Sequence, residues 1–266
     1  MMSVMFWTTP DEVIRREIES VRARRMILDQ LEGGPKTGSE LRESIRKDMA
    51  AQAARKGGRR FKPDKIKVTD PKLYFNTKHL EDIGIVMSQK ESQQRVFSLA
   101  PKAVHPVRRV IGVTRPNLLL TSMARPEDQR PFVAWVSSER RFRAKAVKIF
   151  VEAERFSRGV SRNLEKFVPE GSRTRWKADW YDLPIEVAGD NESGVRGDLI
   201  ATYDEIEEAV KEDVGEFDIV VDLSRGPPTI NIALMLVAME YSLMAIHASA
   251  YEGEKTDLTQ ILPRGE

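Results

Sequence analysis

The stretch from Phe217 to Glu240, FDIVVDLSRGPPTINIALMLVAME, constrains the fold of this chain more than any other. A continuous apolar run stops at Asp222, passes through a short turn rich in proline, and becomes apolar again at once. Two fully buried elements joined by a tight turn explain this pattern. The segment therefore predicts a buried strand up to Asp222 and a buried helix that begins at the prolines.

The same alternation extends across the rear part of the chain. Asp198 is the expected N-cap of an amphipathic helix there. Strands that alternate with helices indicate a mostly parallel sheet covered on both faces, and so an α/β domain over residues 111–266. The expected strands are 117–123, 130–139, 175–185, 217–223 and 243–251, and the expected helices are 139–156, 197–215 and 228–241.

The turn after Asp222 can hold an anion. In open α/β sheets, ligands bind beyond the carboxyl ends of the strands, and a helix N-terminus favours negative charge. Pro227 and Pro228 have no N–H to donate. The remaining donors are the backbone of Arg225, Gly226 and Thr229, two hydroxyls and the Arg225 guanidinium. A tight turn in which Thr229 caps its own helix explains the same residues equally well.

The rear part resembles the CARF domain, a Rossmann-like sensor of CRISPR-linked proteins. The resemblance rests on Asp222-Leu223-Ser224-Arg225-Gly226 followed by Thr229, on WVSSE as a second strand ending in serine, and on LLLTSM as a first strand. It implies a pocket across a dimer two-fold axis that binds cyclic oligoadenylate or another nucleotide effector. The ligand contacts that the resemblance implies are Thr121, Ser122, Ser137, Ser138, Ser224, Arg225, Gly226 and Thr229.

The front part, residues 1–110, has a different pattern. One helix is expected over 11–31 and a second from Thr37 to Gly57, with Thr37 and Glu40 as a capping box. A third helix is expected to start with Asp70 as N-cap and Pro71 in the first position, and to stop at Gly84. IVMS, a polar turn QKESQQ, and RVFSLA then predict a β-hairpin.

Three helices followed by a hairpin are the order of a winged helix-turn-helix. ILDQLEGGPKTGSEL, HLEDIGIV and RVFSLAPKA are similar to the corresponding parts of ArsR-like archaeal regulators. The resemblance implies that the third helix enters the DNA major groove and that the hairpin is the wing. One departure is the link between helices two and three, residues 49–68, which is longer than usual in that family.

Charge supports this division. Residues 1–110 carry 23 Lys and Arg against 14 Asp and Glu, whereas the rest carries 20 against 27. A basic part gains affinity for DNA by releasing counterions, so double-stranded DNA is the expected partner of the front part. The alternative is two ordinary solvated surfaces. The expected DNA contacts are Lys72, Tyr74, Asn76, Lys78 and His79 on the third helix, Lys90 and Arg95 in the wing, and Arg59 and Arg60 in the preceding loop.

Some of these residues have a structural reading as well. Tyr74 and Phe75 can pack instead of reading bases, and His79 can be an ordinary residue of the helix surface. The basic loop that contains Arg59 and Arg60 can be a DNA arm or a solvated loop.

Other classes of protein are less well supported. The chain has no cysteine, which excludes disulfides and thiolate metal sites, and its three histidines show no metal spacing. The N-terminus lacks the features of a signal peptide, and residues 230–250 are interrupted by polar groups, so a cytoplasmic protein with no membrane span is expected. No metal or cofactor is expected.

The combined prediction is a DNA-binding transcription regulator of archaeal type. A homodimer would read a pseudo-palindrome, and the rear domain would sense the nucleotide. The main alternative is a CARF-like phosphodiesterase, a ring nuclease, with an attached nucleic-acid-binding domain. No catalytic base is evident for that reaction, because Asp222 fits a structural role and His247 a packed strand. A purely architectural DNA-binding protein remains a third reading.

Overall fold

The computed structural model of the chain describes residues 8–57, 68–141, 143–156, 158–171, 176–190, 193–249 and 257–262. These residues form two compact units, which meet in the sequence between Thr114 and Arg115. Within the described residues, no helix combines the length and the apolar character needed to cross a membrane.

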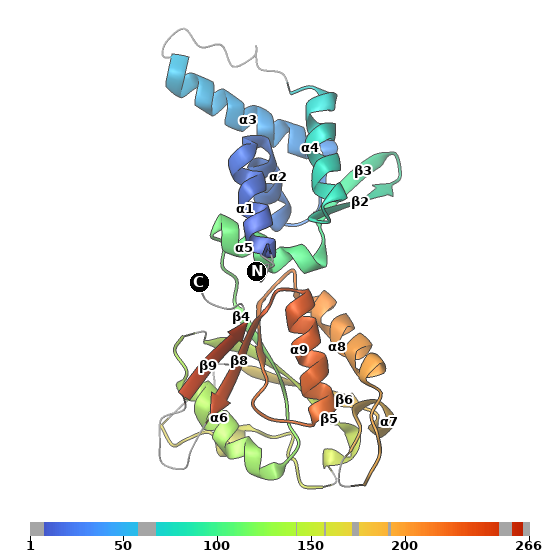
Figure 1. Cartoon of the computed structure of the whole chain (residues 1–266). Coiled ribbons are helices and arrows are strands. Elements are labelled where there is room, and N and C mark those ends of the chain that lie inside the picture. The colour runs from blue at the N-terminus through green and yellow to red at the C-terminus, as the bar shows by residue number, and fades with distance from the viewer. Residues whose placement is uncertain are drawn as a thin grey trace, which may run out of the picture. The chain divides into compact units, whose positions relative to one another are not determined.

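The first unit packs helices beside the β2–β3 hairpin (Figure 1). Its small antiparallel sheet has the strand order β1–β3–β2. Its core is built from one buried apolar face of each helix, with Ile14, Leu28, Leu41, Leu80 and Val107 almost fully enclosed. The elements are α1 (Pro10–Ser20), α2 (Arg22–Glu32), β1 (Lys36–Thr37), α3 (Gly38–Gly57), α4 (Asp70–Asp82), β2 (Val86–Glu91), β3 (Gln94–Leu99), the 3-10 helix η3 (Pro101–Ala103) and α5 (Val104–Ile111).

The expected single helix over 11–31 is wrong, because the chain bends at Val21. The backbone there is extended, with φ −137° and ψ 104°, so α1 and α2 are separate helices. The apolar spacing continues through the bend because Ile18 and Leu28 both face the same core. Hydrophobic periodicity reports which residues are buried, and it did not reveal the break.

The start of α3 confirms the capping box. The Thr37 backbone N–H donates to Glu40 Oε2 (2.7 Å), and the Glu40 N–H donates to Thr37 Oγ1 (3.3 Å). The start of α4 corrects the prediction by one residue: Thr69 precedes the helix, and Asp70 already belongs to it.

The hairpin is confirmed with a tighter turn. The expected polar turn of six residues is wrong, since β2 and β3 continue until Glu91 pairs with Gln94. Only Ser92 and Gln93 connect them, and Ser92 takes a positive φ of 55°.

The second unit is a Rossmann-like α/β domain with a six-stranded, mostly parallel sheet. The strand order is β6–β5–β4–β7–β8–β9, and only β9 runs antiparallel to its neighbour. The main elements are β4 (Asn117–Ser122), the 3-10 helix η4 (Pro126–Asp128), α6 (Gln129–Ser138), β5 (Ala144–Glu152), β6 (Lys177–Leu183), α7 (Ile185–Ala188), α8 (Leu199–Asp213), β7 (Asp218–Asp222), α9 (Pro228–Glu240), β8 (Met244–Ser249) and β9 (Asp257–Leu262), with short 3-10 helices η5 (Ala153–Phe156) and η6 (Glu165–Phe167) after β5.

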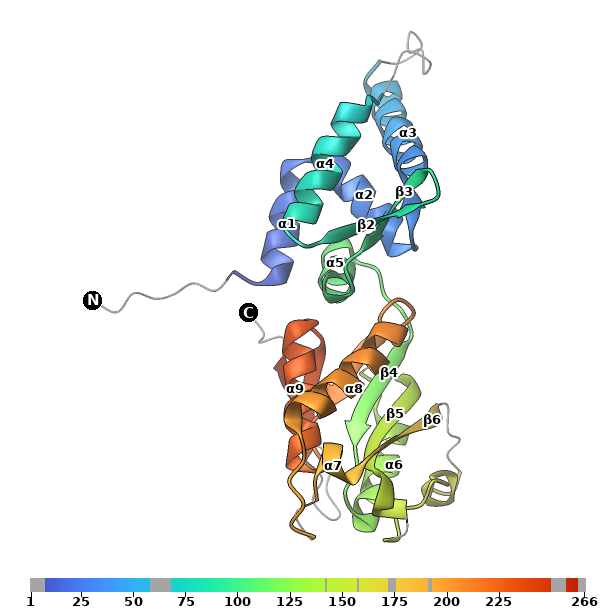
Figure 2. The same cartoon turned by 90° about the vertical axis from the view of Figure 1, so that its right-hand side faces the viewer.

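Helices cover both faces of this sheet. Figures 1 and 2 show α6 on one face and α8 with α9 on the other. Phe132 and Trp135 of α6 pack with Leu119, Ile149 and Val220 of the strands. On the opposite face, α9 packs on β4, β7 and β8. Both faces of the central strands are therefore buried, which is why β4 and β7 read as continuous apolar runs.

Two neighbouring segments have the opposite secondary structure from the one expected. Residues 130–139, expected as a strand, form most of α6, and residues 139–156, expected as a helix, contain β5. A short apolar run fits a buried strand and a buried helix equally. Val147, Ile149, Phe150 and Val151 are β-branched or aromatic and favour the strand that forms there. Strand β9 was not expected.

The expected cap of α8 is confirmed, since Asp198 Oδ1 accepts from the Ile200 and Ala201 N–H groups.

Candidate functional site

The sheet reverses its winding direction between β4 and β7. From β4 the chain crosses through α6 to β5 on one side, whereas from β7 it crosses through α9 to β8 on the other. The two connections leave in opposite directions and open a crevice beyond the carboxyl ends of β4 and β7. This is where Thr121 and Ser122 meet the turn after Asp222.

Asp222 organises that turn. Its carboxylate is fully buried; Oδ2 accepts from Thr121 Oγ1 (2.9 Å), and Oδ1 accepts from the Ser224 N–H (2.9 Å) and from the Ser224 hydroxyl. Ser224 Oγ in turn accepts from the Ala248 N–H (2.6 Å). Burial raises the pKa of Asp222, and the Ser224 and Thr121 hydrogen bonds and the charge of Arg225 oppose the rise. The carboxylate therefore ties β4, β7 and β8 together.

Ser122 and Gly226 meet on the other side of the turn. Ser122 Oγ donates to the Arg225 carbonyl (2.6 Å) and lies 2.6 Å from Asn231 Oδ1. Gly226 has φ +108°, and a Cβ there would lie 1.8 Å from Ser122 Oγ. Only glycine fits, because both the backbone conformation and the space exclude a side chain.

A hollow of about 290 Å³, which we call the Arg225 hollow, lies beside this turn. Arg225 Nη1 is buried and makes no hydrogen bond within the described residues. A buried guanidinium nitrogen without a partner favours an anion nearby. The lining residues are Ala124, Arg125, Asp128, Arg155, Asp190, Ser224, Arg225, Gly226, Pro227 and Pro228.

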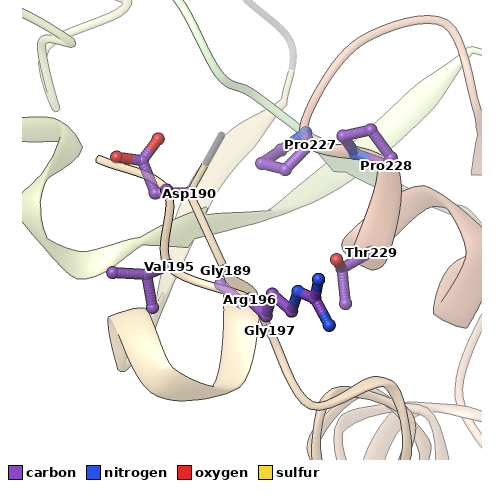
Figure 3. Close-up of a pocket in the computed structure, with 10 residues that line it drawn as sticks. Gly189, Asp190, Val195, Arg196, Gly197, Pro227, Pro228 and Thr229 are labelled. Carbon is purple, nitrogen blue, oxygen red and sulfur yellow. The ribbon is translucent and has the colours of Figure 1, made fainter. Parts of the chain in front are cut away.

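A second hollow of about 360 Å³, the Arg196 hollow, adjoins the first across Asp190, Pro227 and Pro228. Figure 3 shows the prolines and Thr229 on its α9 side and Gly189, Asp190 and Val195–Gly197 opposite them. Gly189 and Gly197 touch so closely that a Cβ on Gly189 would lie 2.4 Å from the Gly197 backbone nitrogen. This contact sets where the loop presents Arg196, which is exposed.

Asp190, the wall between the two hollows, is held by arginines. Arg155 Nη2 donates to Asp190 Oδ1 (2.5 Å), and Arg158 Nη1 donates to Oδ2 (2.7 Å). The Arg155 Nε also lies 3.4 Å from the buried Glu152 Oε2. Because these charges compensate one another, Arg155 and Asp190 serve as a rigid wall.

The structure brings most of the expected ligand residues together, in two layers. Arg225, Gly226 and Ser224 line the Arg225 hollow, and Thr229 lines the Arg196 hollow. Thr121 and Ser122 are fully buried beneath the turn, where their hydroxyls hold Asp222 and the Arg225 carbonyl. In α9 no side chain caps the N-terminus, so the alternative role for Thr229 as a helix cap is not realised.

Ser137 and Ser138 are corrections. They lie in the last turn of α6, which returns the chain to the amino edge of the sheet, away from the strand ends. Ser138 Oγ donates to the Trp135 carbonyl (3.0 Å). The error follows directly from reading α6 as a strand.

Sequence reasoning missed Arg125, Asp128 and Arg196. Arg125 and Asp128 lie between β4 and α6, and a correct assignment of that helix would have placed them at the carboxyl end of β4. Arg196 lies in a glycine-flanked loop before Asp198, and the pair Gly194 and Gly197 is a signal for a tight loop. Among the described residues, no cluster of His, Asp and Glu is arranged to hold a metal ion.

In the first unit, α4 presents part of the expected DNA surface. Lys72, Tyr74 and Lys78 are exposed, and Phe75 beside Tyr74 is exposed too. Lys78 Nζ pairs with Asp82 Oδ1 at 2.5 Å. His79 is partly exposed, and its Nε2 lies 3.0 Å from Glu17 Oε2.

Asn76 is a correction, because it does not lie on the exposed face of α4. Its side chain is 8% exposed, Nδ2 donates to the Lys72 carbonyl (2.8 Å), and Oδ1 accepts from Arg24 Nε (3.3 Å). Both ends of the amide are used inside the unit, so Asn76 supports the helix and is not placed to read a base.

The hairpin carries the remaining expected contacts. Lys90 and Arg95 are both exposed and face each other across the β2–β3 pair. Arg95 donates to Ser88 Oγ (2.6 Å) and to Glu81 Oε1 (3.2 Å). Arg59 and Arg60 lie outside the described residues.

Comparisons with known proteins give similarity at the level of the fold only. No family model matches the chain, and no curated protein matches it. Among solved structures, protein VC1899 from Vibrio cholerae is 14% identical with a TM-score of 0.38, over 56% of this chain and 34% of that one. Enterococcus italicus Csm6, bound to cyclic hexa-2′-fluoro-hexa-dAMP, is 11% identical with a TM-score of 0.42, over 56% of this chain and 42% of that one. The matches span less than half of either neighbour.

Proposed function

We propose that the second unit is a CARF-like sensor that binds a cyclic oligoadenylate or a related nucleotide at the Arg225 and Arg196 hollows. The observation that carries this proposal is the buried Arg225 Nη1, which has no hydrogen-bond partner among the described residues and lies in a hollow at the winding switch point of the sheet. Each hollow also has an exposed arginine, Arg125 in one and Arg196 in the other. Two adjacent cationic hollows suit a ligand with several phosphates.

We further propose that the first unit binds duplex DNA as a winged helix, which makes the chain a ligand-responsive transcription regulator. The order of α2, β1, α3, α4 and the β2–β3 hairpin supports this proposal. So do the exposed Lys72 and Lys78 on α4 and the exposed Lys90 and Arg95 on the hairpin. These cations can contact phosphates, and Tyr74 can contact a base edge or a thymine methyl group.

The proposed regulator acts as a homodimer through α9. Ile232, Leu236 and Met239 recur at helical spacing and are 50%, 41% and 57% exposed. The opposite face of α9 already packs on the sheet, so this helix is apolar on both sides. A helix of that kind is usually covered by a partner. A two-fold axis at α9 is compatible with the pairing of half-sites that dimeric regulators need.

Calorimetric titration with cyclic tetra- and hexaadenylate tests the sensor. We expect binding by the wild type and a loss of at least about tenfold in affinity for Arg225→Ala, since a charge-assisted contact to phosphate disappears. Arg141→Ala is the matched control, because Arg141 is exposed and follows α6 at the amino edge of the sheet. Failure of every oligoadenylate to bind, or equal affinity for Arg225→Ala, would contradict the proposal.

A further inference from the structure

A site that binds only phosphates does not explain one acidic side chain in the Arg225 hollow. Asp128 lines the hollow together with Arg125 and Arg225. A carboxylate near a bound phosphate repels it, so this residue opposes binding of bare inorganic anions. Its presence calls for a reason other than charge attraction.

Asp128 does not cap α6 with its side chain, although its position suggests that role. It ends η4 and directly precedes α6, where an aspartate commonly caps the helix with its side chain. Here Asp128 makes no such cap hydrogen bond. Within the described residues its carboxylate forms no ion pair, but it accepts a hydrogen bond from the Arg125 backbone, and the charges of Arg225 and Arg125 act on it.

The surroundings hold Asp128 ready to accept a hydrogen bond. The residue is partly buried, and burial raises the pKa of its carboxyl while the charges of Arg225 and Arg125 lower it. A partly desolvated carboxylate lacks some of its water contacts, so a donor supplied by a ligand is favourable. In Rossmann-like sites, an acidic residue accepts from a ribose 2′-hydroxyl in this manner.

We propose that Asp128 is a specificity residue that accepts a hydrogen bond from a ribose 2′-hydroxyl next to a phosphate held by Arg225. The inference rests on the proposed nucleotide site and adds the class of ligand: a ribonucleotide rather than a deoxyribonucleotide or a free anion. The 2′-hydroxyl is the group by which proteins distinguish the two sugars. An adenine amino group offers the same donor chemistry, and the test separates the two.

The experiment measures dissociation constants by calorimetry for three probes: cyclic hexaadenylate, its all-2′-deoxy counterpart, and the cyclic hexainosinate, which lacks the amino group. The proteins are the full-length wild type, Asp128→Asn and Asp128→Ser, with Glu127→Gln as the control. Glu127 is an exposed neighbour in η4 that does not line the hollow. Thermal melting of each variant verifies that it is folded.

For the wild type we expect a preference of about tenfold or more for the ribose over the deoxyribose probe, with the inosine probe bound like the adenine one. In Asp128→Asn and Asp128→Ser the preference for ribose should fall below about threefold. The deoxy probe should bind these variants as well as or better than the wild type, because a repulsive charge is gone. Glu127→Gln should retain the full preference.

Two results overturn this inference while the proposed sensor stands. One is a preference for the ribose probe that survives in both Asp128 variants. The other is that the Asp128 variants lose a preference for the adenine probe over the inosine probe, while their preference for ribose over deoxyribose is unchanged. If no probe binds the wild type, the proposed sensor and this inference both fall. In Arg225→Ala, the ribose and deoxyribose probes should both bind more weakly, while the ratio of their dissociation constants stays the same. This result would confirm that phosphate affinity and sugar selection belong to different residues.

Discussion

At the scale of single residues, the site depends on side chains that a ligand would not reach. Thr121, Ser122 and Asp222 are buried, yet they determine where Arg225 and Gly226 lie. A buried carboxylate that accepts three hydrogen bonds is costly to disturb, because each broken bond leaves a polar group without a partner. The turn is therefore rigid before any ligand binds, which lowers the entropic cost of binding.

Gly226→Ala tests this rigidity. The new Cβ would meet Ser122 at the shortest contact found for any described glycine, and φ at this position is +108°. We expect a loss of at least about 2 kcal/mol in the free energy of unfolding of the second unit. Urea titration followed by tryptophan fluorescence reports it, since Trp135, Trp176 and Trp180 lie in this unit.

Gly215→Ala is the matched control for that measurement. Gly215 follows α8, has no positive φ, and has open space around its missing Cβ. Its unfolding free energy should stay within about 0.5 kcal/mol of the wild type. An equally small effect at Gly226 would mean that the turn is not packed against Ser122 as described.

At the scale of elements, α9 presents two different surfaces. Its N-terminus borders both hollows through Pro227 and Pro228, and its outer face carries the apolar stripe of Ile232, Leu236 and Met239. A ligand that contacts the start of this helix and a subunit that covers its outer face would bias the same rigid element. That is the physical basis on which ligand binding and dimer geometry can be coupled.

Leu236→Glu tests the dimer. A charge in the middle of the apolar stripe would have to be buried without a partner in a dimer, so we expect a monomer where the wild type is a dimer. Sedimentation equilibrium at micromolar concentration measures this. Ser138→Glu adds the same charge at an exposed site of α6 on the opposite face of the sheet, and should remain dimeric. A wild type that is monomeric at these concentrations contradicts the proposed interface.

At the scale of the whole molecule, the two units divide the charge of the chain. The basic excess lies in residues 1–110 and the acidic excess in the rest, although the total is only +2. The acidic excess of the second unit does not argue against the proposed anion site, because the arginines at the two hollows act on a ligand at short range. A regulator of this type would bind DNA with one unit and the signal with the other, and removal of either contact should leave the other intact.

The double variant Lys72→Ala/Lys78→Ala tests this division. We expect DNA affinity to fall about tenfold at 0.1 M salt, and the slope of log affinity against log salt to decrease by about 1 to 2, since up to two phosphate contacts are lost. Binding of cyclic hexaadenylate should not change. Lys145→Ala, which removes an exposed charge from β5 in the second unit, is the control. Unchanged salt dependence in the double variant would remove α4 from the proposed interface.

By itself, the sequence determined the local features of this protein. The capping residues Thr37 and Asp198, the hairpin, and the strand–turn–helix from Asp218 onward could be predicted, because neighbouring residues alone specify them. Tertiary structure decided the rest. It made residues 144–152 a strand inside the sheet where a helix was expected, turned Asn76 inward, and placed Ser122 beside Gly226 across a separation of 104 positions. It also placed Asp128 in the lining of the Arg225 hollow. Such placements follow from how elements that are distant in sequence pack on one another, which leaves no mark in any short segment.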